Sequence, residues 1–364
     1  METVELFESV PNFSEGRNAG VIDAIAAAAA PAHLLDVDRD RDHHRVVITL
    51  LAEREPLVDG LVASIAAAAE RIDLRDHAGV HPRVGAADVV PIVPMGNVTL
   101  DECHDVAHEL GERVWSELQI PVYFYGYDEE WSLADIRAGR AQPDLGASLH
   151  PTAGAVCVGA RRLLVAFNVL LPGATVTEAR AIARSIRESG GGMRGVQALV
   201  FELPGERMQL SMNLFRVDEA PPASVIEELE RRGIELGEQQ VVGLCPAIAA
   251  NAAATGHILE ARIGSAVAAA AARRVPADDE GRALARRLRS EAAGLKTLGP
   301  SQEELLAGAE RCAALPPVLQ ATGVLDAELE SMARLAANGL REALTESTRS
   351  TYAARMAALD RRLD

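Results

Sequence analysis

Lysine is almost absent from this sequence: Lys296 is the only one, and it lies in a tail that we expect to be helical. Pyridoxal-phosphate and Schiff-base enzymes need a lysine amine at the reacting carbon, so the sequence excludes both classes of chemistry. The four cysteines are scattered and form no Cys-x-x-Cys pair. This pattern argues for reduced thiols, and against a disulfide framework or a zinc ribbon.

Long apolar runs and a basic N-terminus are also missing. No run reaches the ~18 apolar residues that a membrane span requires, and residues 1–5 are acidic, unlike a signal or transit peptide. We therefore expect a cytoplasmic protein without a membrane partner. The net charge of −17 argues against nucleic acid as a partner, since phosphate binding needs a basic surface. It does not exclude a small anionic ligand held by a local group of arginines.

Two stretches of the chain repeat one order of elements, strand–helix–strand–strand–helix–strand. The first has strands at 4–10, 33–37, 46–52 and 88–94, with helices at 18–30 and 55–71. The second has strands at 163–171, 195–203, 208–217 and 239–244, with helices at 176–188 and 222–232. Each stretch is typical of a ferredoxin-like βαββαβ unit, an antiparallel sheet covered on one face by two helices. The predicted fold class is therefore α/β (α+β), with two such subdomains in tandem.

The remaining segments complete a predicted division into 1–160, 161–250 and 251–364. Between the repeats we expect a helix at 100–118, a strand at 122–125, a short helix at 131–138 and a loop at 139–154. Beyond residue 251 the chain is predicted to be helical throughout, in segments broken near Pro276, Pro300 and Pro316. We expect these helices to pack on the α/β body or on a second subunit.

One histidine lies in a loop whose sequence suits a catalytic residue. Pro82 pushes His81 into an extended conformation, and Gly79 and Gly85 allow turns on either side. Arg83 lies two residues on, so its side chain and that of His81 share one side of an extended segment. A histidine beside a fixed positive charge can act as a general acid or base near neutral pH. From these residues alone, a loop histidine bonded to the backbone is equally compatible.

Three arginines are predicted to gather at one rim of the first sheet. Arg17 ends the segment 10–17, which leads from the first strand into the first helix, where free backbone N–H groups favour anions. A capped turn, with Ser14 or Asn18 as the cap, is the alternative. Arg45 opens the third strand, so it can join Arg17 and Arg83 in a basic pocket, although an exposed turn fits equally well.

Two histidine pairs have the His-x-x-x-His spacing of metal ligands. Between His77 and His81, Gly79 opposes the helix that would bring both side chains to one face. His104 and His108 repeat the spacing on a better helix, but no third ligand is evident nearby in the sequence. We therefore expect no metal site.

A loop rich in small residues precedes the second repeat. Small side chains permit the close approach of a flat ligand, and Arg161, which follows, can receive a carboxylate in bidentate fashion. Taken alone, the loop is also compatible with a glycine-rich connection between domains. Its residues are Gly146, Ala147, Ser148, Leu149, His150, Pro151, Thr152, Ala153 and Gly154.

Several of these segments together resemble the formiminotransferase domain of the glutamate formimidoyltransferase family, which also occurs in formimidoyltransferase-cyclodeaminases. They fall in the family's order over roughly residues 4–251, so the match is more specific than any single motif. The segments are VPNFSEGR (10–17), LLDVD (34–38), HAGVHPRVGAADVVPIVP (77–94), PVYFYG (121–126), GASLHPTAGAVCVGARRLLVAFN (146–168), LSMNL (210–214) and VVGLCP (241–246).

The resemblance implies two α/β subdomains with a folate site between them, commonly in a homodimer. The implied reaction transfers the formimino group from N-formimino-L-glutamate to N5 of tetrahydrofolate in histidine degradation. Tetrahydrofolate is the co-substrate, and neither a metal nor pyridoxal phosphate is expected. The family's catalytic histidine falls on His81 and its folate loop on 146–154. We further expect Arg161 to bind the folate glutamate tail, and Asn12, Arg17, Arg45 and Arg83 to bind substrate.

Two other functions stay open. Formyl exchange between glutamate and 5-formyltetrahydrofolate would use the same pocket. A non-catalytic folate-binding protein would bind folate without turnover, and replacing His81 by alanine would leave its affinity intact. The helical tail is a separate question, because a role in partner binding is compatible with its sequence.

Overall fold

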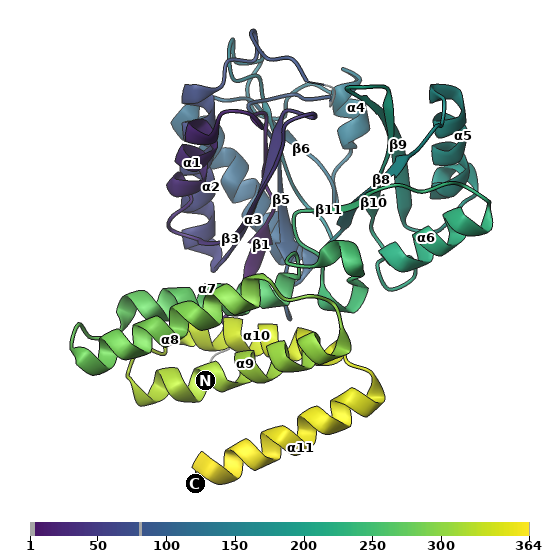
Figure 1. Ribbon diagram of the computed structural model, residues 1–364. Helices are drawn as coiled ribbons and strands as arrows, with labels where there is room; N and C mark the ends of the chain where they lie inside the picture. Colours follow the sequence, from purple (N-terminus) through teal and green to yellow (C-terminus); the bar gives the residue numbers. More distant parts are fainter. Residues whose placement is uncertain (1–3, 80–81, 364) are drawn as a thin grey trace.

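The computed structural model describes residues 4–79 and 82–363. Two sheets stand side by side, their long helices lie on the outer faces, the short α4 (Leu133–Arg137) lies between them, and a layer of helices packs beneath them (Figure 1). This arrangement confirms the predicted fold class of two α/β units followed by a helical region. Among the described residues, none of the helices combines the length and the apolar character that crossing a membrane requires.

The first sheet contains seven strands, in the order β3-β4-β1/β2-β5-β7-β6. The first predicted strand is divided at Pro11, and both of its parts pair antiparallel with β4 and β5. The strands β7 and β6 then continue the sheet in parallel beyond β5. The strands are β1 Phe7–Ser9, β2 Asn12–Phe13, β3 His33–Asp40, β4 Arg45–Ala52, β5 Ala87–Pro94, β6 Val122–Phe124 and β7 Val156–Ala160.

Helices cover one face of this sheet and bury its main core. Asn18 is the cap of the first helix, because its side chain accepts from the backbone N–H groups of residues 20 and 21. A capping box between Thr99 and Glu102 begins the third. These helices are α1 Ala19–Ala28, α2 Arg54–Arg71 and α3 Leu100–Arg113, which continues as a π-helical turn Val114–Leu118. The short α4 Leu133–Arg137 lies on the opposite face, where Ile136 packs with Val89 and Cys157.

The second sheet has the ferredoxin-like strand order β11-β8-β10-β9, and every pairing is antiparallel. Its strands are β8 Val165–Leu171, β9 Val196–Leu203, β10 Arg207–Leu214 and β11 Gln239–Val242. Two helices, α5 Val176–Ile186 and α6 Pro222–Arg231, cover its outer face (Figure 1). This sheet has a hydrophobic core of its own, separate from that of the first sheet.

The C-terminal helices share a third core with the α/β body. Leu6, Leu35 and Leu51 of the first unit pack into it together with apolar side chains of the helices. The expected break near Pro316 was wrong: α9 runs through Pro316 and Pro317, with buried leucines on both sides of the pair. Tertiary packing there outweighs the lost backbone hydrogen bond. The helices are α7 Leu259–Arg274, α8 Asp279–Lys296, α9 Gln302–Ala321, α10 Ala327–Glu342 and α11 Glu346–Leu363.

Candidate active site

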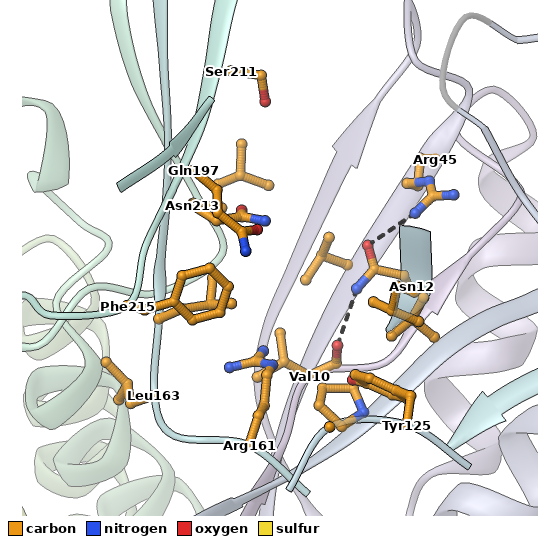
Figure 2. Close-up of a pocket in the computed structure, with 18 of the residues that line it drawn as sticks. Val10, Asn12, Arg45, Tyr125, Arg161, Leu163, Gln197, Ser211, Asn213 and Phe215 are labelled. Atoms are coloured by element: carbon orange, nitrogen blue, oxygen red, sulfur yellow. Dashed lines mark hydrogen bonds between the residues drawn. The ribbon is translucent and has the colours of Figure 1, made fainter. Parts of the chain in front are cut away.

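A cavity of about 630 Å³ lies between the two sheets. The close-up in Figure 2 shows side chains of the first unit on one wall and side chains of the second unit on the other, with Arg161 between them. A volume of this size suits a small organic ligand. The lining includes Glu8, Val10, Asn12, Arg45, Thr49, Tyr125, Glu129, Arg137, Arg161, Leu163, Asn168, Gln197, Ser211, Asn213 and Phe215.

Strand alternation explains why both walls carry polar groups. On β4, Val46 and Ile48 belong to the helix-covered core, so Arg45 and the residues two and four places on face the cavity. On β10, Leu210 belongs to the core of the second unit, and its neighbour Ser211 lines the cavity. The faces of the two sheets that lie opposite their covering helices thus form the site, and the short helix α4 lines part of it.

A buried ion-pair cluster fixes one wall of the cavity. The Arg45 Nη2 donates to Asp88 Oδ2 at 2.6 Å, and Arg137 Nη2 donates to the same oxygen at 3.0 Å. Burial alone would raise the pKa of Asp88, but the two arginines hold it below its usual range. The Arg45 guanidinium also donates to Asn12 Oδ1 at 3.4 Å and to the Pro82 carbonyl oxygen at 3.1 Å. One arginine therefore joins the cavity wall to the residue that follows His81.

His81 itself lies outside the described residues, but the residues on both sides of it make defined contacts. Arg83 Nη1 lies 3.0 Å from His77 Nε2, and Arg83 Nη2 donates to the Gly79 carbonyl oxygen at 3.0 Å. A side chain at position 79 would meet the backbone oxygen of His43 at 2.8 Å. The segment on both sides of His81 is thus packed against the first sheet.

The three predicted arginines lie within electrostatic reach of one another. Burial, followed by the charges of Arg45 and Arg17, lowers the pKa of Arg83. Arg17 is exposed, and its Nε donates to the Arg41 carbonyl oxygen at 3.2 Å. Of the three, only Arg45 lines the cavity. Any role of Arg17 and Arg83 in binding substrate stays a prediction.

At the base of the cavity, Arg161 stands near a buried carboxyl group and a buried phenol. Burial raises the pKa of Glu8 to about 7, although the charge of Arg161 opposes this shift. The buried Tyr125 hydroxyl lies close to the Arg161 guanidinium but forms no hydrogen bond of normal geometry among the described residues. Near neutral pH, Glu8 is therefore only partly ionised, so the charge of Arg161 is available to an anionic ligand.

The loop 146–154 does not line the cavity; it packs against the segment that follows His81. Gly85 forms an isolated β-bridge with Gly154. A side chain at position 154 would meet the Val84 carbonyl oxygen at 2.2 Å. Within the loop, His150 Nδ1 accepts from the Ala153 backbone N–H at 3.0 Å. Folate binding by this loop stays a prediction.

Several residues at the cavity were missed by the reasoning from sequence. Asp88, which binds two arginines that line the cavity, is the second residue of a strand of apolar residues. A buried carboxylate there requires a charged partner, so its position was a usable signal. Gln197 and Asn213 occupy alternate positions of strands β9 and β10, a pattern that also marks an exposed face. Glu8 gave no such signal, because its neighbours in space come from distant segments.

Comparisons with known proteins point to one family. A family model described as the formiminotransferase domain, N-terminal subdomain, matches residues 6–161. The chain is similar to the glutamate formimidoyltransferase of Thermoplasma acidophilum, with 38% identity over 269 residues, covering 67% of this chain and 89% of the relative. The glutamate formimidoyltransferase of Streptococcus pyogenes serotype M1 is 36% identical over 268 residues, covering 67% and 90%.

A longer relative shares the same region. The formimidoyltransferase-cyclodeaminase of Rattus norvegicus is 37% identical over 273 residues, which cover 66% of this chain but only 50% of the relative. The chain thus corresponds to about half of this longer protein.

Proposed function

The chain belongs to the glutamate formimidoyltransferase family, and we propose that it transfers the formimino group from N-formimino-L-glutamate to N5 of tetrahydrofolate, releasing glutamate. The observation that carries this proposal is the cavity between the two sheets, with Arg45 on one wall and Arg161 between the walls. Both substrates are carboxylates, and guanidinium groups bind carboxylates by charge-assisted hydrogen bonds. The cavity thus supplies positive charge in a protein of net charge −17.

Two positions for carboxylates follow from the arginines. We assign the glutamate tail of the folate to Arg161, since it lines the cavity and the buried carboxyl group beside it, Glu8, has a pKa of about 7 and is only partly ionised near neutral pH. We assign the formiminoglutamate to the side of Asn12 and Arg45, close to Pro82. Arg17 and Arg83 add to the positive potential at that side, and the loop 146–154 is assigned to the folate.

His81 is our proposed general acid and base. N5 of tetrahydrofolate attacks the formimino carbon and loses its proton, and the bond from that carbon to the glutamate nitrogen then breaks. His81 takes the proton from N5 and returns it to the departing nitrogen, so the imidazole ends each cycle in its starting state. Juxtaposing the two bound reactants can contribute on the order of 7–11 kcal/mol to the rate enhancement.

The remaining assignments follow the family. We propose that the reaction serves histidine degradation, in a cytoplasmic homodimer. We also propose that residues 1–160 and 161–250 are the two formiminotransferase subdomains and that 251–364 is a helical extension. Each sheet falls within one of the first two ranges, which supports this division.

The test is transfer from formiminoglutamate to tetrahydrofolate, followed as methenyltetrahydrofolate absorbance after acid treatment. We expect turnover by the wild type, loss of turnover with retained folate binding in His81→Ala, and wild-type turnover in His33→Gln. His33 pairs with Glu328 and does not line the cavity, so it is the matched control. An inactive wild type that still binds tetrahydrofolate would overturn the donor assignment in favour of formyl exchange or of simple binding.

A further inference from the structure

Two histidines on α3 present their ring nitrogens on one side of the helix. His104 and His108 are four residues apart, so their side chains lie one above the other. Their ring centroids are 4.4 Å apart. The neighbouring Cys103 is fully buried in the main core, on another side of the helix. The two imidazoles therefore need a third ligand from elsewhere.

Glu129 supplies the third group from a different segment. Its Oε1 lies 2.7 Å from His108 Nε2 and 3.2 Å from His104 Nε2. All three atoms lie within 4.8 Å of one another. Glu129 is 21 residues beyond His108, so the sequence gave no sign that the three side chains would meet.

The turn that carries Glu129 is held in place on both sides. Gly126 and Asp128 adopt positive φ values of 99° and 59°, which turn the chain back toward α3. The Tyr127 backbone N–H donates to the Ala160 carbonyl oxygen at 2.9 Å. The Tyr127 hydroxyl donates to Asp101 Oδ1 on α3 at 2.7 Å. Glu129 is thus fixed relative to both the sheet and the helix.

Aromatic packing fixes the imidazole rings as well. The His108 ring stacks on Phe124 with centroids 3.9 Å apart and planes 13° from parallel. The His104 ring meets Tyr127 edge-on at 6.4 Å. Ligands of a tetrahedral zinc ion are about 3.4 Å apart, so the 3.2 Å and 2.7 Å separations between Glu129 and the two imidazoles must open by about 0.2 Å and 0.7 Å to admit one. The three side chains are partly exposed and have room to do so.

We propose that His104, His108 and Glu129 bind a zinc ion. Two imidazoles and one carboxylate are a ligand set that zinc accepts, whereas magnesium and calcium prefer oxygen alone. Three protein ligands leave one tetrahedral position open. Because Glu129 also lines the cavity between the sheets, the ion would lie beside that cavity and would pin the turn 126–129 to α3.

A second cluster competes for the same ion. Asp36, Asp38 and His257 also offer three ligand atoms within 4.8 Å. However, Arg262 Nη1 lies 3.1 Å from Asp36 Oδ1, and a fixed positive charge at that distance opposes a cation. A variant at His257 therefore serves as a matched control for removing one histidine from a three-residue cluster.

The experiment is a titration of metal-free protein with zinc, in competition with a chromophoric chelator and without either substrate. We expect one tight site per chain, at least about tenfold weaker in His108→Ala and in Glu129→Gln, and unchanged in His257→Ala. Cobalt bound in place of zinc should give visible absorption that both site variants lose. Circular dichroism of the metal-free variants would confirm that they are folded.

Three results would overturn the proposal. They are the absence of stoichiometric zinc in the wild type, equal affinity in His108→Ala, or a loss of affinity in His257→Ala alone. The titration contains no folate and no formiminoglutamate. A failure of the transferase assignment would therefore leave its outcome unaffected.

Discussion

Replacing Glu8 by glutamine removes a buried carboxyl group from the cavity wall and makes stability depend less on pH. Glu8 is 3% exposed, and burial raises its pKa from 4.5 to about 7, with Arg161 opposing the shift and Glu260 adding to it. The folded protein therefore holds this proton more tightly than the unfolded chain does. Between pH 4.5 and pH 7 the folded state binds more protons, so the free energy of unfolding falls as the pH rises.

The size of the effect follows from the shift. Each unit of pKa difference corresponds to about 1.4 kcal/mol, so the carboxyl group costs the folded state about 3 kcal/mol once the pH exceeds 7. Glutamine stays neutral at every pH and resembles the protonated acid in shape. We expect Glu8→Gln to be more stable than the wild type by up to about 3 kcal/mol at pH 8, and about equally stable at pH 4.5.

Urea denaturation at pH 5 and pH 8 measures this difference directly. The exposed Glu235→Gln is the control, and we expect its difference from the wild type to be the same at both pH values. Glu260 titrates in the wild type and in the variant alike, so it does not enter the comparison to first order. A Glu8→Gln variant less stable than the wild type at pH 8, or a difference that does not change with pH, would refute the reasoning.

Three further substitutions test contacts in the cavity wall and directly behind it. Asp88→Asn leaves the guanidinium groups of Arg45 and Arg137 without their carboxylate, and we expect it to lower the free energy of unfolding by about 3–5 kcal/mol in urea; a loss below ~1 kcal/mol would contradict the buried ion pair. Gly85→Ala places a Cβ 1.9 Å from the Ala155 carbonyl oxygen and should lower the melting temperature, whereas Gly20→Ala, whose nearest contact is 3.5 Å, should not. Tyr125→Phe removes a buried hydroxyl that has no hydrogen bond of normal geometry among the described residues, so ligand-free stability should not fall; a clear fall in a thermal scan would contradict this.

Local patterns predicted the two repeats well, because caps and alternation act over a few residues. Asn18, one of the two caps expected for the first helix, is the cap in the structure, and the four strands of the second unit lie close to their predicted positions. The strand β7 was not predicted. Its short run of small and apolar residues is buried on both faces, so it shows no alternation.

Contacts between distant segments could not be predicted from the sequence. The sequence suggested that Arg45 lies near Arg17 and Arg83. In the structure, the charges of Arg45 and Arg17 both lower the pKa of Arg83. It gave no sign that Arg45 would share one carboxylate oxygen with Arg137, or that Glu129 would reach His104. Such pairs form only when strands and turns that are far apart in the chain are brought together.

The third core changes what can be cut from this protein. Leu35 and Leu51 belong to the first unit, yet their neighbours include apolar side chains of the C-terminal helices. A chain shortened at residue 250 would present these leucines to water and should aggregate or require a new cover. A shortened version of this protein therefore has to keep α7 and α10, and it cannot end in the loop near residue 250.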